Sequence, residues 1–138
     1  MTVEQPRAAL TIGRLGRATD CNIETIRYYE RIGLLPPAAR SAGGYRLYGR
    51  DHERRLVFIL KARALGFPLD TVRDLLRLAD EPERPCAEVD GLVAARLAEV
   101  EQKLADLARL KNELDSLAHQ CRGGRIADCR IVEALSPG

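Results

Sequence analysis

The stretch TIGRLGRATDCNIETIRYYERIGLLPP, residues 11–37, holds the pattern that decides the fold. Apolar residues recur at helical spacing from residue 10 to Thr19, and Thr11 can cap this helix by accepting backbone N–H groups. After a break at residues 20–22, a second apolar stripe runs from Ile23 to Ile32 and stops at Gly33, a residue type that often ends helices. Two short helices joined by so brief a turn predict a helix-turn-helix motif.

The next segment, residues 34–50, contains two prolines and two adjacent glycines, which do not fit a helix. Alternating apolar residues after the glycines predict a β-hairpin, or wing, that turns at residues 42–44. We expect Asp51 to cap a third helix that ends at Gly66, and Pro68 to open a fourth in its first turn. Residues 10–79 are therefore predicted to form a winged helix-turn-helix domain in a mainly α-helical protein.

A long helix is predicted at residues 86–119, after an acidic, proline-bearing hinge, ADEPERP, at residues 79–85. Steps of 3 and 4 separate its apolar residues, which are Val93, Leu97, Val100, Leu104, Leu107, Leu110, Leu114, Leu117 and Cys121. Such steps are typical of a coiled coil, although two successive steps of 3 around Leu107 interrupt the register. Because about 30 helical residues span roughly 45 Å, pairing with a second copy is favoured over packing on so small a domain.

Charge is distributed unevenly along the 138 residues. Through Arg77 the sequence has 14 basic against 8 acidic residues, and from Leu78 onward it has 8 against 12. A basic first half suits contact with nucleic acid, although ordinary surface charge would give the same counts.

The sequence has no apolar run of the roughly 18 residues that cross a bilayer and no signal peptide, so we expect a cytoplasmic protein without a membrane role.

Side chains that could contact DNA occur on the second helix and on the predicted wing. Arginine can donate several N–H groups to phosphate or guanine, and a tyrosine hydroxyl can bind phosphate. Each residue alone could equally be solvated surface, but the set together indicates a DNA contact surface. The predicted DNA-binding residues are Thr25, Arg27, Tyr28, Arg40, Tyr45 and Arg46.

Two of the four cysteines lie close together after the long helix. Seven residues separate Cys121 from Cys129, and Gly123 and Gly124 among them allow a loop tight enough to bring two sulfurs to one ion. Thiolates are soft ligands, so the candidate ions are Cu(I), Hg(II), Cd(II), Pb(II) and Zn(II) rather than Mg²⁺ or Ca²⁺. Residues 120–138 are therefore predicted to form a metal-binding loop and a short terminal helix, with chance or burial of the cysteines as the alternative.

The quoted stretch, together with GGYRLYG at residues 43–49 and LGFPLDTVRDLL at residues 65–76, resembles the mercury-resistance-regulator (MerR) family of transcriptional activators. The resemblance covers about residues 10–135, and its most specific pieces are the TIRYYE helix and the R-x-Y wing. It implies a homodimer joined by an antiparallel coiled coil, with each N-terminal module bound to half of a double-stranded promoter site. It also implies that effector binding makes the regulator bend and untwist the DNA so that RNA polymerase can engage the promoter.

The same resemblance bears on the metal. Cys86, Cys121 and Cys129 stand where the divalent-metal branch of the family carries its ligands, and in an antiparallel dimer Cys86 could complete the site across the interface. This implies activation of a metal-resistance or efflux promoter by Hg(II), Cd(II), Pb(II) or Zn(II). The seven-residue gap between Cys121 and Cys129 instead resembles the copper and silver branch, which has serine at the first position, so Cu(I) or Ag(I) is the alternative.

Three other residues give weaker indications of function. Cys21 is expected to be buried structure, His119 could be a fourth ligand but more often such a histidine contacts the helix end or solvent, and His52 has no evident partner. A regulator with an organic or redox effector, whose cysteines could hold an iron–sulfur cluster, is one rival class, and a small thiol-dependent enzyme is another. The sequence reveals no grouped nucleophile, base and orienting residue and no glycine-rich phosphate loop, so we expect a regulator and not an enzyme.

Overall fold

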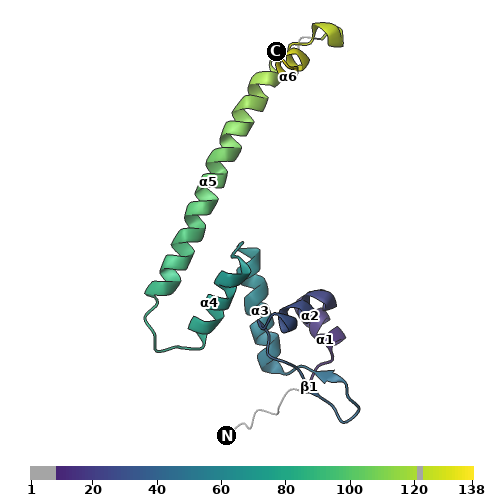
Figure 1. Cartoon of the computed structure of the whole chain (residues 1–138), viewed down its shortest axis with the longest axis vertical. Coiled ribbons are helices and arrows are strands. Elements are labelled where there is room, and N and C mark those ends of the chain that lie inside the picture. Colours follow the sequence, from purple (N-terminus) through teal and green to yellow (C-terminus); the bar gives the residue numbers. More distant parts are fainter. Residues whose placement is uncertain (1–8, 121–122) are drawn as a thin grey trace. The chain divides into compact units, whose positions relative to one another are not determined.

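The computed structural model describes residues 9–120 and 123–138, which are mainly helical. They divide into two compact units, with the boundary between Val89 and Asp90. The element order is α1 (Ile12–Thr19), α2 (Ile23–Arg31), β1 (Ala39–Arg40), β2 (Arg46–Leu47), α3 (Arg50–Ala64), α4 (Leu69–Ala79), α5 (Ala87–Ala118), the 3-10 helix η1 (Ile126–Asp128) and α6 (Arg130–Leu135) (Figure 1).

Helices α1 and α2 form the predicted helix-turn-helix motif. The Thr11 hydroxyl and the Asn22 side chain accept hydrogen bonds from backbone N–H groups in the first turns of the two helices, at 3.3 and 2.7 Å. In the turn between them, the carbonyl oxygen of Cys21 approaches Gly16 closely. A Cβ at position 16 would lie 2.7 Å from that oxygen, so this tight turn requires glycine.

The predicted wing is a two-stranded antiparallel hairpin with strands of two residues each. Its turn falls at residues 42–44, as expected, and reaches a positive φ of +84° at Gly44. Backbone hydrogen bonds of 2.7 and 2.8 Å join Leu10 to Tyr48, so the segment that leads into α1 is fixed to the residue after β2. The hairpin is thereby attached to the helix-turn-helix motif.

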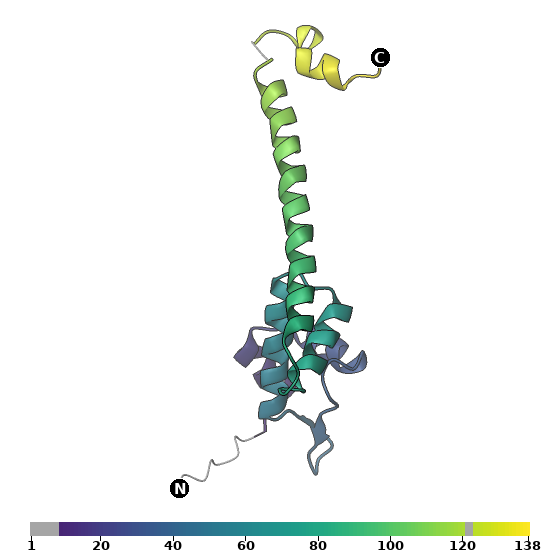
Figure 2. The same cartoon turned by 90° about the vertical axis from the view of Figure 1, so that its left-hand side faces the viewer.

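Helices α1, α2, α3 and α4 share one hydrophobic core. Helices α3 and α4 lie side by side in both views (Figures 1 and 2). The core residues are Leu15, Ile26, Tyr29, Leu34, Leu35, Tyr48, Leu56, Ile59, Ala62, Phe67, Val72 and Leu76. Ile23, which the sequence placed on the apolar stripe of the second helix, lies in the first turn of α2 and is exposed. The stripe therefore begins at Ile26.

The third helix begins one residue earlier than its predicted cap. Gly49 is the N-cap and Arg50 the first residue, so the prediction that Asp51 caps the helix is wrong. His52 closes this end instead: its Nδ1 accepts a hydrogen bond from Gly49 N (3.1 Å), and its Nε2 lies 3.1 Å from the Pro36 carbonyl oxygen. His52 therefore ties the start of α3 to the loop that follows α2.

Helix α5 has 32 residues, close to the predicted range of 86–119, and Figure 2 shows it without a break. None of its side chains is buried by the part of the chain that the structure describes. Its seam residues Val93, Leu97, Leu104, Leu107, Leu110 and Leu114 are 48% to 61% exposed. Among the described residues, no helix has the length and apolar character that spanning a membrane requires.

Candidate nucleic-acid interface

The six predicted DNA-binding residues lie on α2 and on the wing. Tyr45 is 74% exposed and Tyr28 is 39% exposed, whereas Thr25 is half-buried. Arg27, on α2, and the two wing arginines are exposed. All but Thr25 are therefore open to a partner.

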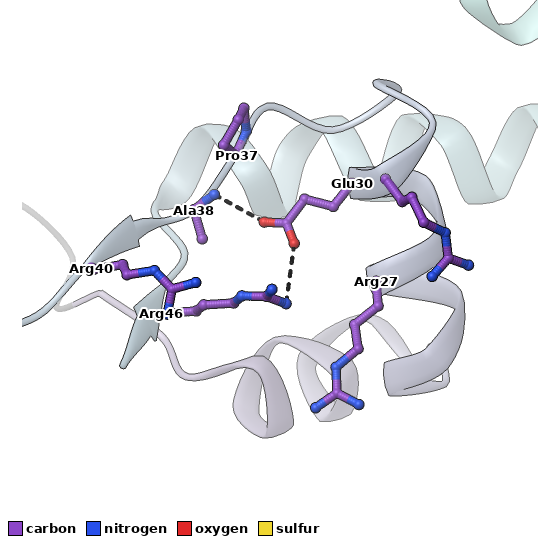
Figure 3. A pocket seen from close by; sticks show the side chains of 7 residues that line it. Arg27, Glu30, Pro37, Ala38, Arg40 and Arg46 are labelled. Carbon is purple, nitrogen blue, oxygen red and sulfur yellow. Dashed lines mark hydrogen bonds and ion pairs between the residues drawn. The ribbon is translucent and has the colours of Figure 1, made fainter. Parts of the chain in front are cut away.

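A pocket of about 430 Å³ opens between α2 and the wing (Figure 3). We call it the arginine pocket, and its lining residues are Arg27, Glu30, Arg31, Pro37, Ala38, Arg40 and Arg46. A second hollow, of about 500 Å³, shares Arg27, Arg40 and Arg46 with it and also includes Tyr45. The structure thus gathers four of the six predicted residues, while Thr25 and Tyr28 line neither hollow.

Two arginines of this set are each oriented by a neighbour. The Arg40 Nη1 donates to the Gly44 carbonyl oxygen (2.9 Å), which fixes the side chain along the wing. The Arg27 Nη1 lies 3.0 Å from Glu24 on the same helix. A guanidinium has five N–H donors, so a single partner leaves others for a phosphate. The pocket therefore presents preoriented cations at a concave surface.

Two residues of the arginine pocket were missed by the sequence reasoning. Arg31 adds a cation, and its guanidinium carbon stands 5.6 Å from the centre of the Tyr28 ring. Glu30 adds a carboxylate, which lies 3.6 Å from Arg46 and accepts a hydrogen bond from Ala38 N at 2.9 Å (Figure 3). Glu30 ends the TIRYYE motif and Arg31 directly follows it, but the partners of Glu30 lie outside the motif.

The cysteines predicted as metal ligands fall in different parts of the chain. Cys86 is an exposed free thiol directly before α5, and Cys129 is a half-buried free thiol at the junction of η1 and α6. Cys121 lies outside the described residues. Within residues 9–120 and 123–138, no three His, Cys, Asp or Glu side chains are grouped closely enough to hold a metal ion. The predicted ligand set therefore stays a prediction.

Cys21 and His119 have local structural roles. Cys21 is half-buried against the core, and burial, followed by the charge of Asp20, raises the pKa of its thiol. The expectation that it is structural agrees with this position. His119 Nδ1 lies 2.6 Å from the Asp115 carbonyl oxygen at the end of α5, where a histidine commonly interacts with free helix carbonyls.

Comparison with known proteins gives two matching family profiles. Residues 10–79 match the profile described as MerR HTH family regulatory protein, and residues 53–117 match the one described as MerR, DNA binding. The Heavy metal-dependent transcription regulator 2 of Rhizobium meliloti (strain 1021) is 34% identical over 94% of this chain and 88% of its own length. The similarity thus extends over nearly the whole of both chains.

Two solved structures show the same similarity. PbrR691 from Ralstonia metallidurans CH34, in complex with lead(II), is 43% identical, with a TM-score of 0.81 over 92% of this chain and 99% of that one. MerR from Bacillus megaterium MB1, in complex with mercury(II), is 32% identical, with a TM-score of 0.70 over 91% and 98%. On the matching profiles and these relatives, the chain belongs to the MerR family of helix-turn-helix regulatory proteins.

Proposed function

We propose that this chain is a metal-responsive transcriptional regulator that binds promoter DNA as a homodimer and activates a metal-resistance or efflux promoter. The observation that carries the DNA-binding part is the gathering of Arg27, Arg40 and Arg46 around one concave surface between α2 and the wing. Phosphate oxygens are the ligands that such preoriented guanidinium groups favour. The metal response rests on the cysteines and on the relatives with lead(II) and mercury(II).

The homodimer is supported by α5. Its seam of apolar residues is about half exposed, and a seam of this length is costly to leave in water. From Leu97 to Leu117 the steps between seam residues are 3, 4, 3, 3, 4 and 3, which read the same in both directions about Leu107. Two antiparallel copies with Leu107 at the twofold axis would therefore bring every seam residue of one helix opposite a seam residue of the other.

Charge also favours the antiparallel arrangement. Within α5, residues 87–106 contain five acidic and two basic residues, whereas residues 107–118 contain two acidic and two basic residues. Parallel helices would place the two acidic halves together, and antiparallel helices place each beside the less acidic half of its partner. The dimer we propose is consequently antiparallel, with a local change of supercoil at the two successive steps of 3.

We assign the metal to the thiolates of Cys86, Cys121 and Cys129. The donor chemistry fits a soft ion, since Cys86 and Cys129 are free thiols. In an antiparallel dimer the start of one α5 meets the end of the other, so Cys86 would complete the site of the partner copy. When bound, the ion would link the terminal loop of one copy to the start of α5 in the other.

A divalent ion, Hg(II), Cd(II), Pb(II) or Zn(II), suits three thiolates, whereas Cu(I) or Ag(I) needs only two. Replacing Cys86 by Ser distinguishes these ions, because it removes a third ligand and leaves the pair at positions 121 and 129. A divalent response should be lost in this variant, and a response to Cu(I) should survive. The same substitution leaves the arginine pocket untouched and is expected to preserve DNA binding.

We propose that the protein acts in the cytoplasm by distorting promoter DNA. Binding of the metal would change how the two copies hold their half-sites, bending and untwisting the DNA so that RNA polymerase can engage the promoter. No catalytic role is proposed, since the relatives described above are regulators by name. A regulator with an organic or redox effector stays the alternative, and it should give no thiolate-to-metal absorption when the reduced protein is titrated with these ions.

The direct test begins with selection of an operator sequence from random double-stranded DNA. Anisotropy titration of the selected DNA should give specific binding that weakens steeply with salt, because phosphate contacts release counterions. Metal titration in the ultraviolet should then give thiolate-to-metal absorption. Absence of any selected sequence would contradict DNA binding, and absence of absorption with every soft ion would contradict the metal response.

A further inference from the structure

The Glu30 carboxylate joins three segments of the first unit. Its Oε1 accepts a hydrogen bond from Ala38 N (2.9 Å), just before β1, and its Oε2 accepts one from the Tyr48 hydroxyl (3.3 Å), just after β2. The Arg46 guanidinium, on β2, lies 3.6 Å from the same Oε2. One side chain near the end of α2 therefore contacts residues beside both strands of the wing, and Figure 3 shows its contacts with Ala38 and Arg46.

This carboxylate is sheltered from water. The Glu30 side chain is 12% exposed and Tyr48 is fully buried, so the interactions between them are little screened. Burial, followed by the negative charge of Glu30, raises the pKa of the Tyr48 phenol, so its hydroxyl stays protonated and remains a donor at neutral pH. The connection between α2 and the wing is therefore retained under physiological conditions.

The Leu10–Tyr48 backbone pair ties the wing to the segment before α1, whereas Glu30 ties it to α2. The strands of the wing are two residues long each, and isolated hairpins of two strands are marginally stable in water. Two of the predicted DNA contacts, Arg40 and Arg46, lie on these strands, while Arg27 lies on α2. The distance between these cations thus depends on what holds the wing to α2.

Glu24 is an instructive contrast on the same helix. It is also paired with an arginine, since its Oε1 lies 3.0 Å from Arg27, but its side chain is 79% exposed. Both partners of that pair belong to α2, so the pair joins no other segment. A carboxylate that only neutralises a neighbouring arginine would look like Glu24, whereas Glu30 is buried and connects separate elements.

We propose that Glu30 is a positioning residue for DNA recognition, whose carboxylate fixes the wing against α2 so that Arg27 and Arg46 face one stretch of phosphate backbone. This rests on the proposed function. Arg46 is 42% exposed and shares Glu30 with two other donors. Because Ala38 N and the Tyr48 hydroxyl still donate to the carboxylate, Arg46 can turn to a phosphate without leaving the sheltered oxygens of Glu30 without hydrogen bonds.

A double-mutant cycle on operator affinity tests this inference. Glu30→Ala and Arg46→Ala should each weaken binding about tenfold, and the double variant should be weakened only about twentyfold instead of about a hundredfold, because Glu30 acts through Arg46. Glu24→Ala is the matched control. Combined with Arg46→Ala it should give the product of the two single effects, because nothing joins Glu24 to the wing.

The salt dependence of binding separates positioning from stability. A variant that is partly unfolded only lowers the active concentration, so its slope of log affinity against log salt stays that of the wild type. A misdirected wing loses phosphate contacts, so the slope for Glu30→Ala should fall by about one to two. Glu30→Gln, whose amide oxygen can still accept from Ala38 N, keeps the fold in case Glu30→Ala loses helicity, and should show a smaller change in the same direction.

Several results would overturn the inference. Additive effects in the cycle, an unchanged salt slope, or binding by the Glu30 variants as tight as or tighter than that of the wild type would each make Glu30 a neutralising surface group. These outcomes leave the proposed function intact, since the wild type still binds its operator. Failure of the wild type to bind any selected DNA would overturn both proposals together.

Discussion

The two units of the chain differ in where their apolar residues find partners. In the first unit, helices and wing share a core, and every buried hydrophobic residue of the described chain lies between Leu15 and Leu78. In the second unit, α5 has a regular seam of leucine and valine but no buried side chain in the part of the chain that the structure describes. The first unit thus has its core within one copy, whereas in the proposed dimer the seam of the second unit is covered by another copy.

The largest effect on the contrast between the two units is expected from a substitution at the centre of the α5 seam. Leu107→Glu places two carboxylates at the proposed twofold axis and should weaken dimerisation about a thousandfold or more, because a buried unpaired charge is costly. Light scattering at micromolar concentration should then report a monomer. Ala105→Glu, on the same helix but off the seam, should remain dimeric. A dimeric Leu107→Glu variant would contradict the proposed pairing.

Two side-chain substitutions to alanine, one in each unit, test the difference between the units. Ile59 is fully buried in the core, so Ile59→Ala should lower the free energy of unfolding by about 2–5 kcal/mol. Leu97→Ala should act through the dimer, so its melting temperature should rise with protein concentration more strongly than that of Ile59→Ala. Calorimetry at two concentrations tests this. Equal concentration dependence in the two variants would mean that α5 is stabilised within its own chain.

Whether a residue's partners lie near it or far from it in the sequence also explains which features the sequence could predict. The cap at Thr11, the turn at residues 42–44 and the extent of α5 were predicted correctly, because neighbouring residues determine each of them. Glu30 and His52 were missed, since each has a partner far along the chain that only the fold brings near: Tyr48 is 18 residues from Glu30, and Pro36 is 16 residues from His52. The proposed thiolate site would draw on more than one segment, which is why spacing alone leaves the identity of the ion open.

A smaller effect is expected at the arginine pocket. Arg27→Ala should weaken operator binding about tenfold and lower the salt slope by about one, because a single phosphate contact is removed. Circular dichroism should remain that of the wild type. Arg109→Ala provides the matched control, since Arg109 is paired with Asp106 on α5 and lies outside the pocket. Equal losses in both variants would indicate a general charge effect in place of a contact.

The smallest expected difference concerns the two described thiols nearest the N-terminus. Because the pKa of Cys21 is raised by burial, less of it is thiolate at neutral pH, and it should react with a thiol reagent more slowly than the exposed Cys86. Mass spectrometry after brief alkylation of the reduced protein measures both rates. Faster modification of Cys21 would contradict its assignment to the core.

Transcription from an operator-bearing promoter, reconstituted with RNA polymerase and each soft ion in turn, tests the central claim most directly. The account predicts activation by at least one of Hg(II), Cd(II), Pb(II), Zn(II) or Cu(I), and complete loss of that response in the Cys121→Ser, Cys129→Ser double variant, which should still bind the operator. Serine offers a hard, protonated hydroxyl in place of a soft thiolate, so the ion loses its ligands. Activation by the double variant equal to that of the wild type would contradict the account.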